Sequence, residues 1–244
     1  MKKMRLDDAL VARHLSESRN QAQRTITSGL VKVNGLKELR PGQLVSEPMT
    51  IIVEAAPLRF VGRGGHKLDH ALQLFQLDVR DLVVADVGAS TGGFTDAVLR
   101  RGARKVYAID VGYGQLDAKL RQDERVINLE RHDARQIEKL EEQVALIVVD
   151  VSFVSLRSIL PHVTKWLAAG GDLVVLFKPQ FEASDNIVAR CKGVIKDLAI
   201  HAGLLEDFRQ WCKSNHLLEK GFVESPLVGD KGNHEYLFWL QPES

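Results

Sequence analysis

The chain has 244 residues, 45% of them hydrophobic, and Lys and Arg outnumber Asp and Glu by one. This is the composition of a soluble globular protein, long enough for one large domain or for a large and a small one. No apolar run approaches the ~18 residues that a membrane-spanning helix needs, and the first residues lack the apolar core of a secretory signal. Two cysteines, Cys191 and Cys212, stand in no metal-ligand spacing. We therefore expect a reduced, cytoplasmic protein without a bound metal, and the sequence assigns neither thiol a role.

Positive charge is concentrated at the amino-terminal end. Residues 1–56 hold nine Lys and Arg against six Asp and Glu, a balance of +3, whereas the remainder holds 24 against 26, a balance of −2. The basic end favours an anionic partner, and a solvated basic surface is the simpler alternative.

The first fifty residues have the pattern of a small α+β module. Apolar spacing predicts a helix through Leu6 and Leu10, and Ser18 is a candidate cap for a second helix that ends at Gly29. The remaining elements are a strand at 31–33, a tight turn at Asn34–Gly35 and a closing strand at 50–53.

A basic face is expected on this module. Several polar residues lie on the second helix away from its apolar side, and two lysines flank the hairpin turn. On charge alone, a solvated surface explains them equally well. The candidate contacts to an RNA phosphate backbone are Arg5, Arg19, Gln23, Arg24, Lys32 and Lys37.

A linker at 55–62 leads to a glycine-rich loop and a helix with apolar residues at i, i+3, i+4 and i+7 from Leu68. Lys67 lies beside this apolar stripe, in what we expect to be the exposed first turn. The helix dipole favours anions at that end, so a lysine there hints at a role outside the helix. An ordinary solvated lysine is the alternative.

Residues 82–96 are the segment around which the rest of the chain is organised. They read as a buried strand, a glycine turn and the start of a helix, with Asp86 near the carboxyl end of the strand. Open α/β sheets bind their ligands at this end of the strands. The turn lacks the second glycine of the pyrophosphate fingerprint G-x-G-x-x-G, which favours a ligand with a nucleoside and an amino acid but no phosphate. Glycines that serve packing alone are the alternative.

Charged residues recur at the ends of the later strands. A strand at 105–110 ends in Asp110, whose carboxylate can accept hydrogen bonds from both hydroxyls of a ribose. A short strand at 126–129 precedes Asp133 and Ala134, which could reach an adenine edge. The expected strand at 145–151 carries Asp150 near its end, and the strand at 172–177 is followed by Lys178. Because the carboxyl ends of parallel strands share one edge of a sheet, we expect these side chains at one site.

The carboxyl-terminal part completes an α/β pattern. We expect a loop at 183–192, a helix at 195–213 and closing strands at 217–223 and 235–240, the last beginning at Glu235. Alternation of strands and helices predicts a mostly parallel sheet with helices on both faces.

Two sets of motifs resemble known families. Ser18-Arg19, Ala22, Ile26, Gly29 and the run V-K-V-N-G at 31–35 resemble the RNA-binding domain named after the fourth small-subunit ribosomal protein. The order Lys67, Asp150, Lys178 and Glu235 resembles the Lys-Asp-Lys-Glu tetrad of FtsJ-type ribose 2′-O-methyltransferases. The run D-V-G-A-S-T-G-G-F-T-D at 86–96 is similar to the S-adenosylmethionine loop of that group. Together the two modules resemble the TlyA family of ribosomal RNA methyltransferases, also labelled hemolysins.

The resemblance implies three segments: an RNA-binding domain at 4–54, a linker at 55–62 and a Rossmann-like class I methyltransferase domain with a seven-stranded sheet at 63–244. The cofactor implied is S-adenosylmethionine. Its candidate ligands are Asp86, Gly88, Ser90, Thr91, Gly92, Gly93, Phe94, Asp110, Asp133, Ala134 and Asp150.

The tetrad suggests how the reaction runs. A ribose hydroxyl is a poor nucleophile until its proton is being removed, and a lysine amine can remove it when burial or a second cation favours the neutral amine. Lys178 is the candidate base, and Lys67 is the neighbouring cation that holds phosphate or ribose. Glu235 orients a lysine, and Asp150 aligns Lys178 with the methyl donor. Before Glu235 the chain reads Gly-Asn-His, where the FtsJ group has a serine and a basic residue.

The family implies a cytidine in 23S ribosomal RNA as the target, and its longer members also modify 16S RNA. Because this chain begins almost directly at the module, we expect 23S activity alone. Ribosomal RNA or a ribosomal subunit is the expected partner, with no membrane. The alternatives are a small-molecule or protein methyltransferase, a non-catalytic RNA-binding or assembly factor, and a membrane-lytic hemolysin.

Overall fold

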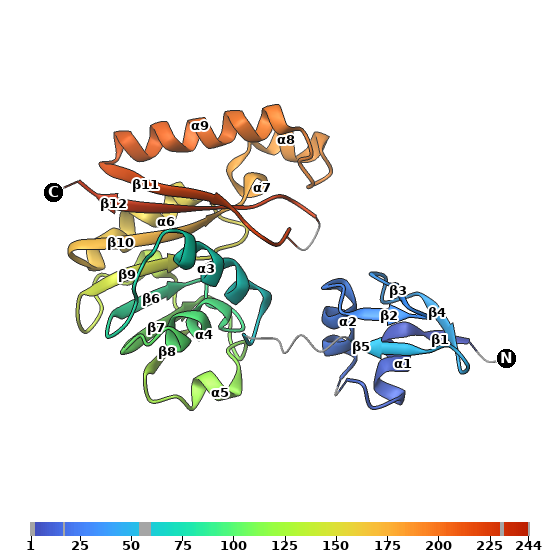
Figure 1. The fold of residues 1–244 in the computed structure, drawn as a ribbon. Coiled ribbons are helices and arrows are strands. Elements are labelled where there is room, and N and C mark those ends of the chain that lie inside the picture. The colour runs from blue at the N-terminus through green and yellow to red at the C-terminus, as the bar shows by residue number, and fades with distance from the viewer. Residues whose placement is uncertain (1–2, 17, 54–59, 230–231, 244) are drawn as a thin grey trace. The chain divides into compact units, whose positions relative to one another are not determined.

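The computed structural model describes residues 3–16, 18–53, 60–229 and 232–243. The chain divides into two compact units, 1–57 and 58–244, each of which is described by itself (Figure 1). The expected linker at 55–62 lies outside the described residues except for its last three. Of these, Phe60 is buried against His66 of the second unit, and the backbone N–H of Val61 donates to the Asp96 carboxylate at 2.8 Å.

The first unit has two small sheets packed with two helices. Its core is a single apolar cluster that includes Leu6, Leu10, Ile26 and Val31. β1 pairs with β4, and β2 lies between β3 and β5, all antiparallel. The elements are β1 (Lys3–Arg5), α1 (Leu6–Ala12), α2 (Arg19–Thr27), β2 (Val31–Val33), β3 (Leu36–Lys37), β4 (Leu44–Ser46) and β5 (Ile51–Val53).

Local sequence signals account for most of this unit. Ser18 caps α2, as predicted, because its side-chain oxygen accepts the N–H of Gln21 at 3.2 Å. Asn34 and Gly35 both have positive φ, 50° and 82°, which is the two-residue turn predicted between β2 and β3. β1 and β4 were not predicted from the sequence; β1 buries none of its side chains and β4 buries one, so neither shows a core pattern.

The second unit is built on a seven-stranded sheet in the order β11-β12-β10-β9-β6-β7-β8. The strands from β10 to β8 pair in parallel, and β12 is antiparallel to both β10 and β11. The predicted α/β class with a mostly parallel sheet is confirmed. The strands are β6 (Val83–Val87), β7 (Lys105–Asp110), β8 (Val126–Glu130), β9 (Val144–Val149), β10 (Leu167–Phe177), β11 (Leu217–Glu224) and β12 (Tyr236–Pro242).

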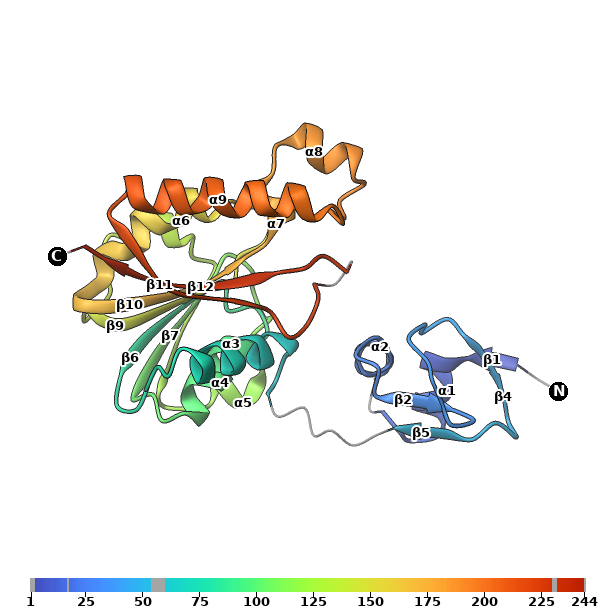
Figure 2. The same cartoon turned by 45° about the horizontal axis from the view of Figure 1, so that its top comes forward.

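Helices cover both faces of this sheet (Figure 2). Alternate residues of each strand face opposite ways: Val83 and Ala85 of β6 join the apolar cluster under α6 and α9, and Val84 joins the cluster under α3 and α4. The helices are α3 (Arg63–Leu74), α4 (Gly93–Arg100), α5 (Ala118–Arg121), α6 (Leu156–Val163), α7 (Pro179–Glu182), α8 (Asp185–Arg190) and α9 (Leu198–Ser214), with short 3-10 turns at Ala134–Gln136 and Thr164–Trp166.

Two expectations about the secondary structure of this unit are wrong. The segment 183–192 is not a loop throughout, because α8 forms within it. α3 begins at Arg63, so the glycines Gly64 and Gly65 are helical rather than part of a loop before the helix. Among the described residues, none of the helices has the length and apolar character that crossing a membrane requires.

Candidate active site

The charged strand ends meet at one edge of the sheet, where two cavities share a wall. The larger has a volume of about 740 Å³ and the smaller about 460 Å³. Gly88, Ser90, Asp150, Ser152, Phe153 and Val154 line both. The parallel strands β6, β7, β9 and β10 end together at this edge, as the sequence pattern predicts.

The glycine turn after β6 lies between the two cavities, and its residues Gly88 and Ser90 line both of them. Gly88 has φ +86°, and a Cβ atom there would lie 2.4 Å from the carbonyl oxygen of Asp150. The turn can therefore pass β9 this closely only with glycine at position 88. Three predicted cofactor residues, Thr91, Gly93 and Phe94, line the larger cavity next to this turn.

Asp110 lies at the end of β7 and faces the smaller cavity. Its carboxylate accepts the backbone N–H of Ser90 at 2.8 Å and that of Gly112 at 2.7 Å, so its orientation is fixed. Asp133 and Ala134 line the same cavity, and Asp133 is ion-paired with Arg135 at 2.6 Å. The structure thus gathers the three residues predicted for the ribose and adenine side of a nucleoside.

Two predicted cofactor residues, Asp86 and Gly92, line neither cavity. Asp86 is fully buried below the glycine turn, where one carboxylate oxygen accepts the Thr95 hydroxyl at 2.6 Å. Its other oxygen, Oδ1, has no hydrogen-bond partner among the described residues. Side-chain alternation points this residue of β6 under α4 and not out of the sheet edge, and its contact with the cofactor stays a prediction.

Burial raises the pKa of Asp86 to about 7, and the negative charges of Asp150 and Asp110 act in the same direction. The folded protein therefore holds this proton more tightly than the unfolded chain, whose aspartates titrate near 3.8. The free energy of unfolding should fall as pH rises between these values, by about 1.4 kcal/mol per pH unit from this group.

Asp86→Asn, which cannot ionise, should remove that dependence. We expect the variant to gain stability relative to the parent from pH 4 upward, with a plateau above pH 7. Urea unfolding of both proteins at several pH values measures the difference. Parallel stability curves would contradict the buried, proton-holding role of Asp86.

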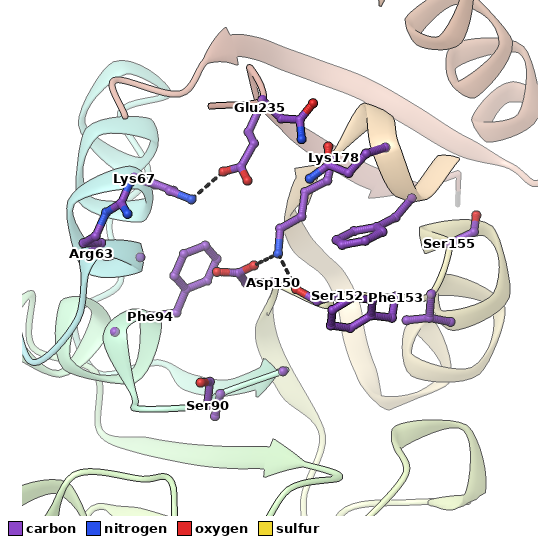
Figure 3. A pocket seen from close by; sticks show the side chains of 18 of the residues that line it. Arg63, Lys67, Ser90, Phe94, Asp150, Ser152, Phe153, Ser155, Lys178 and Glu235 are labelled. Carbon is purple, nitrogen blue, oxygen red and sulfur yellow. Dashed lines mark hydrogen bonds and ion pairs between the residues drawn. The ribbon is translucent and has the colours of Figure 1, made fainter. Parts of the chain in front are cut away.

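Lys178 and Asp150 form an ion pair in the wall of the larger cavity (Figure 3). Lys178 Nζ lies 2.6 Å from Asp150 Oδ1 and donates to the Ser152 hydroxyl at 3.0 Å. The Lys178 side chain is only 9% exposed and that of Asp150 is 22% exposed. The pair is thus mostly removed from solvent but open on one side to the cavity.

Lys67 and Glu235 form a second ion pair in the same cavity, with Lys67 Nζ donating to Glu235 Oε2. Figure 3 shows the two side chains pointing toward each other, Lys67 from α3 and Glu235 from the residue just before β12. Lys67 is buried, so its expected exposure is wrong. Its amine enters the cavity and pairs with the buried carboxylate of Glu235 instead of pointing into solvent.

Phe153 is a cavity residue that the sequence analysis did not select. It is 92% exposed, lines both cavities and has φ 64°, a conformation that costs a bulky residue about 1–3 kcal/mol. Its ring lies 5.2 Å from the ring of Phe181. Its position three residues after Asp150 was the one feature of the sequence that could have suggested a place in the site. Its exposure and backbone conformation cannot be predicted from the sequence.

Asn233 was also missed as a site residue. It is buried, with Oδ1 accepting the N–H of Ile195 and Nδ2 donating to the carbonyl of Gly193, both at 2.9 Å. It therefore ties the segment between α8 and α9 to the segment before β12, where Glu235 lies. These two hydrogen bonds give the asparagine a structural role at position 233, where the chain departs from the FtsJ pattern.

The six candidate RNA contacts all lie in the first unit. Arg5, Arg19 and Gln23 converge on one buried residue, Asp7. Lys32 and Lys37 are partners across the β2–β3 ladder, and Arg24 is exposed on α2. Among the described residues, no group of three or more His, Cys, Asp or Glu is arranged to hold a metal ion.

Comparisons with known proteins agree with this architecture. The model of the FtsJ-like methyltransferase family matches residues 60–242, and that of the S4 domain matches residues 4–52. A Mycobacterium tuberculosis relative named 16S/23S rRNA (cytidine-2′-O)-methyltransferase TlyA is 39% identical over the whole chain and 91% of its own length. A Campylobacter jejuni relative named 23S rRNA (cytidine-2′-O)-methyltransferase TlyA is 32% identical over 95% of this chain and 97% of its own.

Solved structures lead to the same group. A Streptococcus thermophilus protein described as a hemolysin is 40% identical, with a TM-score of 0.78, over 100% of this chain and 90% of the other. The family model covers well over half of the chain, and the named relatives cover nearly all of it. The chain therefore belongs to the FtsJ-like methyltransferases and, among them, to the TlyA family.

Proposed function

We propose that this methyltransferase transfers a methyl group from S-adenosylmethionine to the ribose 2′-hydroxyl of a cytidine in 23S ribosomal RNA. The observation that carries the proposal is the pair of lysine–carboxylate ion pairs in one cavity, beside a second cavity lined for a nucleoside. Two buried cations at the end of an α/β sheet suit a ribose and its flanking phosphates. They have no evident use on a small neutral substrate.

The smaller cavity fits the nucleoside of S-adenosylmethionine. The oriented carboxylate of Asp110 suits the two ribose hydroxyls, and Ala134 suits the adenine ring. Gly88, Ser90 and Asp150 line both cavities, so the remainder of the molecule can pass along the glycine turn toward Asp150. When bound, this cofactor supplies a methyl group already activated by the sulfonium charge.

The chain's own residues prepare the other reactant. In its neutral form Lys178 can accept the proton of the 2′-hydroxyl, and its contacts with Asp150 and Ser152 fix where its amine lies. Lys67, fixed by Glu235, supplies the positive charge that holds the ribose or a neighbouring phosphate. Much of the rate gain is expected from this alignment, because the donor needs no further activation.

Phe153 is proposed as the surface on which the target base stacks. An exposed aromatic ring between the two cavities can hold a base that has left its helix, and such stacking contributes about 1–3 kcal/mol. Phe153→Ala should lower kcat/KM for RNA by about 10- to 100-fold, and Phe153→Tyr should retain most activity. Leu198→Ala, an exposed apolar residue that lines neither cavity, is the control. Equal activity of the Phe153→Ala and control proteins would contradict this role.

Ribosomal RNA as substrate is supported by the S4 domain match and by the names of both relatives, which share the 23S target and the cytidine. We propose 23S RNA as the substrate of this chain because the names of both relatives include it. Such a substrate implies that the reaction takes place in the cytoplasm.

Mapping of methylated nucleotides tests the proposal. Ribosomal RNA is prepared from cells with and without the gene, and positions blocked at the 2′ oxygen are compared by mass spectrometry of RNA fragments. We expect a 2′-O-methylcytidine in 23S RNA that depends on the gene and is restored by the purified protein with S-adenosylmethionine. A protein that binds both molecules but adds no methyl group would instead be a non-catalytic assembly factor.

A further inference from the structure

The first unit contains a buried carboxylate that none of the catalytic steps uses. The side chain of Asp7, in the first turn of α1, has no exposed surface. Both of its oxygens accept hydrogen bonds from Arg5, with Nε at 2.9 Å from Oδ1 and Nη2 at 2.9 Å from Oδ2. Oδ2 also accepts from Arg19 Nε at 3.1 Å and from Gln23 Nε2 at 2.7 Å. One carboxylate thus gathers three of the six residues expected to contact RNA.

The geometry leaves the gathered arginines able to bind something else. A guanidinium has five N–H donors, and Asp7 accepts two from Arg5 and one from Arg19. The side chains of Arg5 and Arg19 remain 43% and 52% exposed. The hydrogen bonds from Arg5 lower the pKa of Asp7 despite its burial, so the carboxylate is charged at neutral pH.

We propose that Asp7 is a positioning residue that holds Arg5 and Arg19 in the arrangement that binds RNA phosphates. This inference rests on the proposed role of the first unit in binding RNA. The sign of its effect separates this role from simple electrostatics. An acid beside a phosphate-binding surface repels RNA, so removal of its charge alone should tighten binding. If Asp7 instead fixes the two guanidinium planes, its removal frees them and binding should weaken, because bidentate contacts to phosphate depend on orientation.

Asp8 provides a matched control in the neighbouring position. Its carboxylate also lies near Arg19, at 3.3 Å from Nε, but its side chain is 46% exposed and it contacts neither Arg5 nor Gln23 in the described ion pairs and hydrogen bonds. Asp7→Asn and Asp8→Asn therefore remove the same charge from the same neighbourhood, and only the first removes the convergence point.

The experiment measures binding of the full-length proteins to ribosomal RNA over a range of salt concentrations. Asp7→Asn should weaken binding about tenfold or more and make the dependence of log Kd on log salt less steep by about one. Asp8→Asn should bind as the parent does or more tightly. In methyl transfer, the loss in Asp7→Asn should appear in KM for RNA rather than in kcat. Equal affinities of the two variants would overturn the proposal.

A second substitution covers the case in which Asp7→Asn does not fold, as judged by circular dichroism. Asp7→Glu keeps the charge but moves it by one methylene. A positioning role predicts weaker RNA binding by this variant, whereas an effect of charge alone predicts no change in affinity. Parent-like affinity of Asp7→Glu overturns the proposal.

The double variant Arg5→Ala, Arg19→Ala separates this inference from the proposed RNA surface. If that double variant binds RNA normally, both ideas fail. If it binds weakly while Asp7→Asn matches Asp8→Asn, only the role of Asp7 fails.

Discussion

Replacing Lys178 with alanine is expected to slow methyl transfer by about 10²- to 10⁴-fold at saturating RNA and cofactor, the usual contribution of a general base. The amine of Lys178 is the group that faces the cavity from a fixed position between Asp150 and Ser152. Without it, the ribose hydroxyl must lose its proton to water. Single-turnover transfer of a labelled methyl group to ribosomal RNA measures the loss.

Two comparisons make this experiment specific to a base. Lys178→Arg retains a positive charge, but a guanidinium cannot give up its proton, so it should be nearly as slow as the alanine variant. Lys165→Ala, which removes an exposed lysine from the 3-10 turn after α6, should act as the parent does. An active Lys178→Arg protein would contradict proton removal by this side chain and leave only a role as a cation.

Removing Glu235 is expected to have the largest effect on stability. Glu235 and Lys67 are both buried, so Glu235→Ala leaves an unpaired ammonium in the protein interior. The loss of one partner from such a pair lowers the free energy of unfolding by about 3–5 kcal/mol. Methyl transfer should fall as well, because Lys67 no longer has a fixed position. Urea unfolding and single-turnover transfer measure the two effects separately.

The double variant Lys67→Met, Glu235→Leu distinguishes folding from catalysis. Apolar residues of similar size often replace a buried ion pair without loss of stability. We therefore expect the double variant to unfold near the parent's midpoint and to remain deficient in methyl transfer. Recovery of activity together with stability would show that the pair only holds α3 against β12.

The fold of the larger unit was predictable because its signals are local and repeated. Apolar runs that end in Asp110 or just before Asp150 and Lys178 locate the strands, and parallel strands must bring those ends to one edge. The expectation that Lys67 and Glu235 join Asp150 and Lys178 rested on a family resemblance, because their sequence separations alone do not determine which residues meet.

The features that were not predicted from the sequence depend on contacts between segments far apart in the chain. Lys67 is buried against Glu235, 168 residues away, a contact that helix periodicity cannot reveal. The exposed Phe153 and the contacts of Asn233 arise from loops with no periodic pattern. No sequence motif singles out Asp7, and only its contacts with Arg19 and Gln23, 12 and 16 residues away, indicate a use for it.

The most direct test of the central claim is the position of the transferred methyl group. Ribosomal RNA lacking the modification is incubated with the protein and methyl-labelled S-adenosylmethionine and then hydrolysed with alkali, which cannot cleave beside a 2′-O-methyl group. The account predicts that the label appears in alkali-stable dinucleotides whose 5′ residue is cytidine, and that Lys178→Ala abolishes it. Label in mononucleotides, which indicates methylation of a base, would contradict the account.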